Sequence, residues 1–197
     1  MEQTDLLRHA VAVLEALDVP YLVVGSFASI AYGEARFTQD IDIVAALEMR
    51  HVAPFLAAFP APEFYRSESA IREAIRDAFQ FNVIHPASGN KIDFILPRSG
   101  PWAAARMARR RPVRLLPDKD VMTAAPEDVI IGKLWYYAEG GGDRHLRDIA
   151  GILRVTGEGV DRAEVERWAK ELGYLEIWRE IVVKVDAPDA SSGPGSP

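Results

Sequence analysis

The chain of 197 residues contains no cysteine and only four histidines. The lack of cysteine excludes disulfide bonds, a thiol nucleophile and metal sites built from thiolates. It also fits a reducing compartment, so we expect a cytoplasmic protein. The histidines are scattered and include no pair at His-x-x-x-His spacing, so the sequence carries no zinc motif of that kind.

Long apolar runs are absent as well. No stretch approaches the roughly 20 apolar residues that cross a membrane, and the start, MEQTDLLRHA, does not resemble a signal peptide. We therefore expect no membrane partner. The net charge is -6, which argues against a surface built as a whole for nucleic acid and leaves room for a local basic patch.

The residues that are present predict a mixed α/β first half. Short apolar runs alternate with segments of helical periodicity, and Thr4 is the expected N-cap of the first helix. The polar HPASGN segment between two of the runs predicts a hairpin. The expected helices are 4–17, 26–32, 49–59, 68–78 and 102–110, and the expected strands are 21–24, 41–44, 79–84, 91–96 and 113–116.

After residue 117 the pattern becomes helical. Periodic apolar residues predict helices over 126–137, 144–155, 162–172 and 176–185. The final segment, APDASSGPGSP, is rich in proline, glycine and serine, and we expect it to be disordered.

Residues 23–44 read VVGSFASIAYGEARFTQDIDIV and place two carboxylates on an otherwise apolar strand. Because side chains alternate along a strand, Asp40 and Asp42 share one face about 7 Å apart, while Ile41 and Ile43 share the other. Like charges at that separation repel each other. We expect solvent, a basic side chain or a bound divalent cation to offset the repulsion.

A third acid, Asp93, lies in the strand-like run KIDFIL. A solvated strand face would explain any one of these aspartates. Three clustered carboxylates, however, suit Mg²⁺ or Mn²⁺, which prefer oxygen ligands. Upstream, Gly25 and Ser26 begin an expected helix, whose N-terminal amides and dipole favour a phosphate group. A metal site beside a phosphate site indicates a nucleoside triphosphate (NTP).

This pattern resembles the signature of the DNA polymerase β-like nucleotidyltransferase superfamily. That signature is an apolar residue, Gly, Gly or Ser, roughly a dozen residues, then Asp, an apolar residue and Asp or Glu, with a third carboxylate on a later strand. The matching residues are Val24, Gly25, Ser26, Asp40, Ile41, Asp42 and Asp93.

The resemblance implies a nucleotidyltransferase fold of the α+β class. A core with a mixed twisted sheet flanked by helices would cover residues 1–117. A helical C-terminal domain would cover 118–186, with the active cleft between the two and a disordered tail over 187–197.

The resemblance also implies a Mg²⁺-dependent enzyme (or one using Mn²⁺) that moves a nucleotidyl group from an NTP to an acceptor hydroxyl. Asp40, Asp42 and Asp93 would be its catalytic and metal-binding residues, and Gly25 and Ser26 would bind phosphates. The acceptor stays open between an RNA or tRNA end, a protein and a small molecule. The alternative is a catalytically silent nucleotide-binding or interaction protein of the same fold.

The segment PEDVIIGKLWYYAEGGGDRHLRDIAGIL resembles the C-terminal motifs of AbiEii-like bacterial nucleotidyltransferases, which carry a helical lysine and then an Arg-x-x-Lys-Asp-x-x-Asp pattern. Lys133 matches the lysine, and Arg144, Arg147 and Asp148 match the next positions, with Arg in place of Lys at 147. Gly151 replaces the last Asp. The resemblance implies that Lys133 and Arg144 neutralise triphosphate charge. It also implies the toxin of a toxin–antitoxin pair, with a cognate antitoxin, as one role, and a resistance or housekeeping role stays open beside it. An ion pair between Arg144 and Asp148 within one helix is the simpler interpretation of that spacing.

The densest basic run spans residues 106–114 and contains five arginines. We interpret it as a solvated face, or else as a patch for an RNA backbone or other acceptor. The aromatic residues Trp135, Tyr136 and Tyr137 could stack a base, but on a helix we expect them in the core. His145 is expected on a helix surface.

Overall fold

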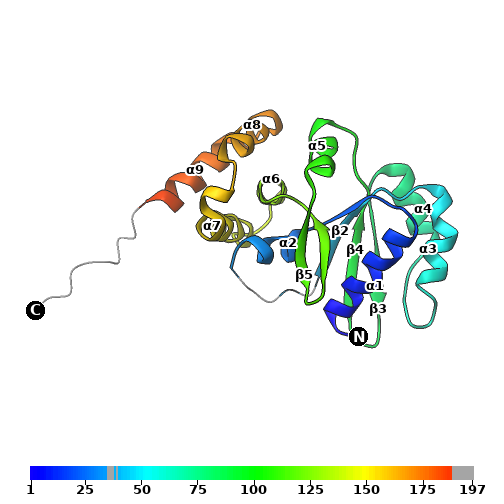
Figure 1. Cartoon of the computed structure of the whole chain (residues 1–197). Helices are drawn as coiled ribbons and strands as arrows, with labels where there is room; N and C mark the ends of the chain where they lie inside the picture. Colours follow the sequence, from blue (N-terminus) through cyan, green and yellow to red (C-terminus); the bar gives the residue numbers. More distant parts are fainter. Residues whose placement is uncertain (35–37, 39, 188–197) are drawn as a thin grey trace, which may run out of the picture.

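The computed structural model describes residues 1–34, 38 and 40–187. Within them a six-stranded sheet carries helices on both faces (Figure 1). The expected tail, 187–197, lies outside the described residues except for Ala187.

The strands are β1 Tyr21–Val24, β2 Asp40–Ala45, β3 Gln80–His85, β4 Asn90–Ile95, β5 Arg111–Leu116 and β6 Lys119–Thr123. The helices are α1 Gln3–Ala16, α2 Gly25–Tyr32, α3 Val52–Ala58, α4 Glu68–Asp77, α5 Pro101–Arg109, α6 Pro126–Ala138, α7 Arg144–Thr156, α8 Arg162–Leu172 and α9 Leu175–Asp186, with 3-10 turns η1 Met49–His51 and η2 Gly157–Gly159.

The sheet is mixed, with the strand order β3-β4-β2-β1-β6-β5. β2 lies between β4, to which it runs parallel, and β1, to which it runs antiparallel. β3 and β4 form the antiparallel hairpin that the HPASGN segment predicts. The predicted α+β class with a mixed sheet is therefore confirmed.

The strand β2 separates an apolar face from a carboxylate face. Ile41 and Ile43 are fully buried in a core that includes α1, α3 and α4. Phenylalanine rings of α3 and β4 pack edge to face in this core. Asp40 and Asp42 alternate with the isoleucines and belong to the opposite face, as the pleat of a strand requires.

A second core lies on the carboxylate face and holds the C-terminal helices. Val44 of β2 packs there with Ile130 of α6, Ile149 of α7 and Trp168 of α8. In Figure 1 these helices lie on the other side of the molecule from α1, α3 and α4. As a result, α6 and α7 stand beside the sheet on the face to which the aspartates belong.

The sheet extends past residue 117, the expected end of the core. The strand β6 is absent from the sequence prediction because only Val121 and Met122 in KDVMT are strongly apolar. Its place depends on pairing with β5 on one side and with β1 on the other, where Thr123 lies opposite Val23. A boundary at 117 would cut the β5–β6 hairpin, and the helical segment begins only at Pro126.

Two helix starts also differ from the prediction. The first helix begins at Gln3 with Glu2, rather than Thr4, in the N-cap position. The helix predicted over 49–59 begins as η1 and becomes α-helical only at Val52. Pro54 explains this, because proline has no N–H to donate and is tolerated only in the first turn of an α-helix.

The other predicted helices and strands are present, with ends shifted by no more than one or two residues. No helix in the described part of the chain is long and apolar enough to span a membrane.

Candidate active site

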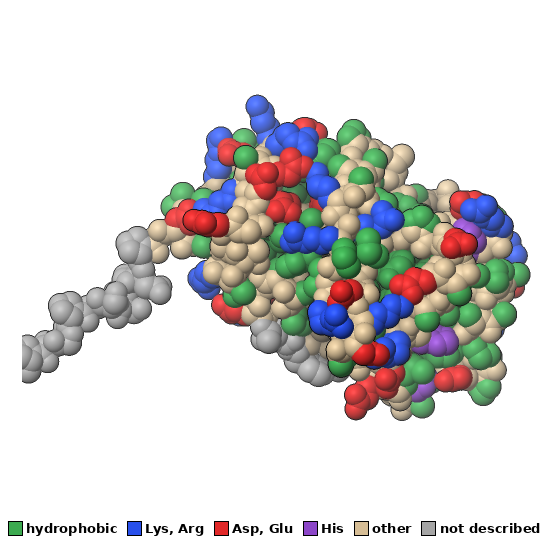
Figure 2. All heavy atoms as spheres, viewed as in Figure 1, with side chains coloured by type: hydrophobic (Ala, Val, Ile, Leu, Met, Phe, Trp, Pro, Cys, Tyr) green, Lys and Arg blue, Asp and Glu red, His purple; other side chains and the backbone are tan. Residues whose placement is uncertain are grey.

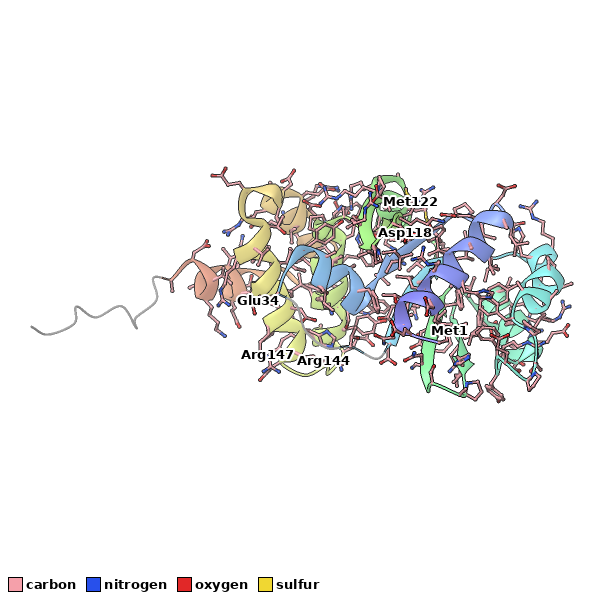
Figure 3. All side chains as sticks on the ribbon, turned by 60° about the horizontal axis from the view of Figure 1, so that its bottom comes forward. Met1, Glu34, Asp118, Met122, Arg144 and Arg147 are labelled. Carbon is pink, nitrogen blue, oxygen red and sulfur yellow. The ribbon has the colours of Figure 1, made fainter. Side chains whose placement is uncertain are left out.

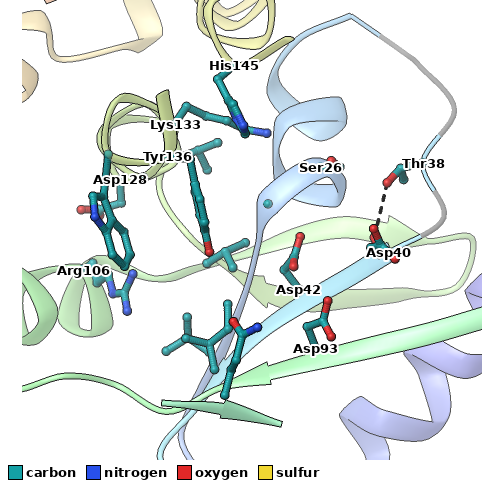
Figure 4. A pocket seen from close by; sticks show the side chains of 18 of the residues that line it. Ser26, Thr38, Asp40, Asp42, Asp93, Arg106, Asp128, Lys133, Tyr136 and His145 are labelled. Carbon is teal, nitrogen blue, oxygen red and sulfur yellow. Dashed lines mark hydrogen bonds between the residues drawn. The ribbon is translucent and has the colours of Figure 1, made fainter. Parts of the chain in front are cut away.

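Three carboxylates meet on one face of the sheet. β2 carries Asp40 and Asp42, and Asp93 lies directly opposite Asp42 on the parallel neighbour β4 (Figure 4). The side chain of Asp40 is 57% exposed and that of Asp93 only 17%. The register of two strands therefore brings together acids that lie far apart in the sequence.

A lysine that the sequence analysis did not single out offsets part of their repulsion. The Nζ of Lys91 lies 2.9 Å from Oδ2 of Asp93 and 3.5 Å from Oδ1 of Asp40. Lys91 precedes Asp93 by two residues on β4, so strand alternation puts both side chains on one face. Of the three expected ways to balance the charges, the structure contains the basic side chain.

The surroundings of Asp42 disfavour the charged form of its carboxyl group. Its burial raises the pKa of the carboxyl above the usual range, and the neighbouring charge of Asp93 raises it further. Lys133 and Lys91 act in the opposite direction without cancelling the effect. A cation or a phosphate-bound metal beside Asp42 would therefore stabilise its ionised form.

Gly25 lies against this carboxylate. Its φ is +62°, in the left-handed region, and a Cβ built on it would lie 1.9 Å from Oδ2 of Asp42. Only glycine allows the start of α2 to approach β2 so closely. Ser26, the next residue of α2, also lines the space above the carboxylates.

A pocket of about 530 Å³ opens over these residues. Its sides come from α2, α5, α6 and the start of α7, while strands β1 to β4 contribute the strand residues (Figure 4). The lining residues are Val24, Gly25, Ser26, Thr38, Asp40, Asp42, Val44, Gln80, Asp93, Ile95, Trp102, Arg106, Asp128, Val129, Gly132, Lys133, Trp135, Tyr136, Arg144 and His145. All seven residues expected to form the site line this one pocket.

The three carboxylates match Mg²⁺ or Mn²⁺ in chemistry, because both ions prefer oxygen ligands. As the side chains stand, no group of three acids or histidines within residues 1–34, 38 and 40–187 is arranged to hold a metal. The ammonium of Lys91 lies between Asp40 and Asp93. A divalent cation would have to displace this ammonium group from the carboxylates. The three carboxylates therefore have the right chemistry for the ion, but their side chains and that of Lys91 would have to rearrange to bind it.

Lys133 forms a buried ion pair that its sequence context did not predict. Its Nζ lies 2.6 Å from Oδ2 of Asp148, and the two side chains are only 6% and 7% exposed. The pair joins α6 to α7 at the pocket wall. Asp148 therefore bonds Lys133, and the ion pair expected between Arg144 and Asp148 is not the one formed.

The two arginines of the predicted motif point to different places. Arg144 lines the main pocket, whereas Arg147 lines a separate groove between α7 and α9. Figure 3 shows both side chains projecting from the start of α7. Of these two arginines, Arg144 is therefore the one that can contribute charge to the main pocket.

Two expectations about the aromatic and histidine residues were wrong. Trp135 and Tyr136 line the pocket rather than the core, and Tyr136 is 44% exposed. His145 is 7% exposed rather than on the surface, and its ring stacks on Tyr136 with centroids 5.8 Å apart. The apolar face of α6 is taken up by Ile130 and Leu134, which leaves the aromatic rings on the pocket side.

The arginine run does not form one basic patch. Arg109 bonds Asp128 and Glu164, and Arg114 pairs with Asp120. Figure 2 shows basic and acidic side chains interspersed over the visible face. Arg106, by contrast, turns into the pocket. Arg110 donates to the carbonyl of Met107 and Arg111 to the hydroxyl of Tyr32. The run is therefore divided among ion pairs, local hydrogen bonds and the pocket wall.

Comparison with known proteins identifies the fold. No protein-family model and no curated protein sequence matches the chain. The structure of ANT(2'')-Ia in complex with adenylyl-2''-tobramycin is similar with a TM-score of 0.58 at 14% identity, over 90% of this chain and 97% of that chain. JHP933 from Helicobacter pylori is similar with a TM-score of 0.52 at 18% identity, over 95% of this chain and 83% of that chain. The chain has the nucleotidyltransferase fold.

Proposed function

We propose that this protein transfers a nucleotidyl group from an NTP to the hydroxyl of an acceptor. The observation that carries the proposal is the register that places Asp42 and Asp93 side by side on parallel strands. Both line a pocket in which the backbone of Gly25 lies against Asp42. Carboxylates beside a glycine at a helix N-terminus are the parts that phosphoryl-type transfer needs, since such catalysis depends mainly on positioning and electrostatics.

In the proposed reaction, the acceptor oxygen attacks the α-phosphorus of the NTP. The bond from the α-phosphorus to the oxygen bridging toward the β-phosphate breaks, and pyrophosphate leaves with that electron pair. The proton of the acceptor hydroxyl passes to the carboxylate of Asp93, which lies opposite Asp42 on the neighbouring strand. The products are the nucleotidylated acceptor and pyrophosphate.

The other pocket residues would hold the triphosphate. Gly25 and Ser26 would direct backbone N–H groups toward it, and Lys133 and Arg144 would add positive charge from α6 and α7. Mg²⁺ or Mn²⁺, held by Asp40, Asp42 and Asp93, would supply further neutralisation of the triphosphate charge.

The acceptor and the biological role are narrower proposals. The complex of ANT(2'')-Ia with adenylyl-2''-tobramycin supports a small molecule as one class of acceptor, and an RNA or tRNA end and a protein are the others. The AbiEii-like resemblance supports a toxin with a cognate antitoxin, through Lys133, Arg144 and Asp148. Growth arrest on expression of the protein, absent with Asp42→Asn, would support that role.

Incubation with each α-labelled NTP, Mg²⁺ and fractionated cell extract tests the proposed reaction. We expect one fraction, whether RNA, protein or small molecule, to take up the label. Asp93→Asn should lower the rate by about 10²–10⁴-fold, the range for loss of a general base, while retaining NTP binding. No labelled fraction with any NTP would refute the reaction, and equal labelling by the variant would refute the role of Asp93 as its general base.

A further inference from the structure

The pocket has two chemically different ends. The three aspartates lie at one end with Ser26, and Arg106 lies across the pocket from them beside Asp128 (Figure 4). Lys91 pairs with two of the carboxylates and Lys133 pairs with Asp148, whereas no ion pair joins Arg106 to any acid in the described part of the chain. The end of the pocket that Arg106 occupies is therefore chemically distinct from the carboxylate end.

Arg106 is a partly buried cation whose hydrogen-bonding capacity is not fully used. Its Nε is buried and has no hydrogen-bond partner, and its guanidinium lies 4.6 Å from the ring centroid of Trp102. Burial lowers the pKa of Arg106, but an arginine in a protein keeps its charge. A buried donor without a partner costs free energy, so a ligand that supplies an acceptor would be stabilised here.

The nearby acids are committed to other partners. Oδ1 of Asp128 accepts hydrogen bonds from Arg109 at 2.5 Å and from Nε1 of Trp102 at 3.0 Å. Glu164 bonds both Arg109 and Arg167. The field of Asp128 favours the charge on Arg106, yet no ion pair joins them among the described residues. An anionic group of a ligand would supply the direct ion pair that Arg106 lacks.

The NTP does not provide that anion. Under the proposed function, its phosphates lie beside Gly25, Ser26 and Lys133, and its sugar and base carry no charge. The acceptor is the remaining molecule in the pocket. A guanidinium presents a planar fork of donors that matches the two oxygens of a carboxylate or phosphate, and that of Arg106 lies over the ring of Trp102.

We propose that Arg106 binds an oxyanion of the acceptor, so that the acceptor carries a carboxylate or a phosphate besides the hydroxyl that receives the nucleotide. This inference rests on the proposed function and narrows its substrate class. Tyr136 and Trp102 would flank the anion and exclude water, which strengthens the pairing. A purely cationic acceptor would be disfavoured, because its charge would approach Arg106.

The test uses the full-length protein saturated with Mg²⁺ and a non-hydrolysable NTP analogue, so that the triphosphate site is filled. Acetate and inorganic phosphate are then titrated separately, and the melting temperature is recorded. We expect at least one of them to raise it, and the more effective anion identifies a carboxylate or a phosphate acceptor. Arg106→Met should weaken the apparent affinity for that anion about tenfold or more, and Arg106→Lys should weaken it less.

Arg98→Met is the matched control. Arg98 also lies over an aromatic ring, that of Trp135 at 5.3 Å, but it is exposed and does not line the pocket. The melting temperature of Arg98→Met should rise with the anion as it does for the wild type. An equal response of Arg106→Met, or no response of the wild type to either anion, would overturn the inference. Failure of the analogue itself to raise the melting temperature would instead overturn the proposed function, and this inference with it.

Discussion

A Cβ on Gly25 would lie 1.9 Å from Oδ2 of Asp42. The first turn of α2 and the strand β2 are thus in contact where the proposed phosphate and carboxylate sites meet. Gly25 is constrained twice, by this contact and by its φ of +62°. The two constraints can be separated experimentally.

Gly25→Ala should destabilise the protein and abolish NTP binding. Gly89 has a φ of +72°, and a Cβ added to it would meet no atom within 4 Å, so it is the control for backbone strain alone. We expect Gly89→Ala to cost about 1–2 kcal/mol and Gly25→Ala about 1–3 kcal/mol more, since overpacking adds to the strain. Urea unfolding measures both. Equal losses would mean that Asp42 moves aside freely.

Asp42→Asn should raise stability at neutral pH. Because burial raises the pKa of this carboxyl in the folded state, the folded protein binds the proton more tightly than the unfolded chain does. The stability that Asp42 contributes is therefore present at low pH and is lost as the pH rises through the folded pKa. The gain from Asp42→Asn should therefore shrink as the pH falls through the folded pKa and be lost below about pH 4, near the ordinary carboxyl pKa.

Melting curves of the wild type and Asp42→Asn between pH 3 and pH 8 (roughly the range spanned by the two protonation states) measure this effect. Asp40→Asn is the matched control, since its side chain is 57% exposed and should change stability little. If Asp42→Asn were less stable than the wild type at every pH, the buried carboxylate would not be a source of instability.

The Asp40→Asn, Asp42→Asn double variant should lose the stabilisation that Mg²⁺ and an NTP analogue give the wild type. A ligand at 100 times its Kd stabilises a folded protein by about 2.7 kcal/mol, which a melting curve detects easily. The ligand-free double variant should remain folded because like-charge repulsion is relieved. If it gained as much from the ligands as the wild type, these residues would not form the metal site.

Lys91→Met should strengthen metal binding while weakening the ligand-free protein. The ammonium of Lys91 lies 2.9 Å from Asp93 and 3.5 Å from Asp40, so it competes with a divalent cation for the same oxygens. Isothermal titration with Mn²⁺ measures the affinity directly. Lys119→Met removes a lysine at another ion pair, with Glu15, and should leave Mn²⁺ affinity unchanged. Weaker Mn²⁺ binding by Lys91→Met would show that Lys91 does not compete.

Lys133→Met should cost about 3–5 kcal/mol, because it removes one partner of a buried ion pair. A second substitution, Asp148→Leu, should restore most of that stability. If Lys133 also binds the triphosphate, the double variant should be stable in urea yet still bind the NTP analogue more weakly. Wild-type affinity in the double variant would assign Lys133 a structural role alone.

Local patterns predicted most of the fold. The alternation of Asp40, Ile41, Asp42 and Ile43 is a property of the strand pleat, so it assigned the two faces of β2 without knowledge of its neighbours. The helices after residue 126 were equally accessible, because their apolar periodicity is strong. β6 was missed because its burial comes from pairing with β1 and β5 rather than from its own five residues.

Position in the site was harder to predict than secondary structure. Lys91 reads as an ordinary strand residue until the register of β2 and β4 puts it between two carboxylates. Arg106 belongs to a run that resembles a solvated face, yet it turns inward where α5 meets the pocket. Neither position is encoded at short range, since each depends on how separate elements pack.

The sequence by itself determined the chemistry that this protein has available. It contains no thiol, it places Asp40 and Asp42 on one strand face, and it begins α2 with a glycine. Only the tertiary structure decided which of these groups meet. Strand register and helix packing act between distant residues, and they set the contact of Gly25 with Asp42, the pairing of Lys133 with Asp148 and the burial of the Arg106 Nε in the pocket wall.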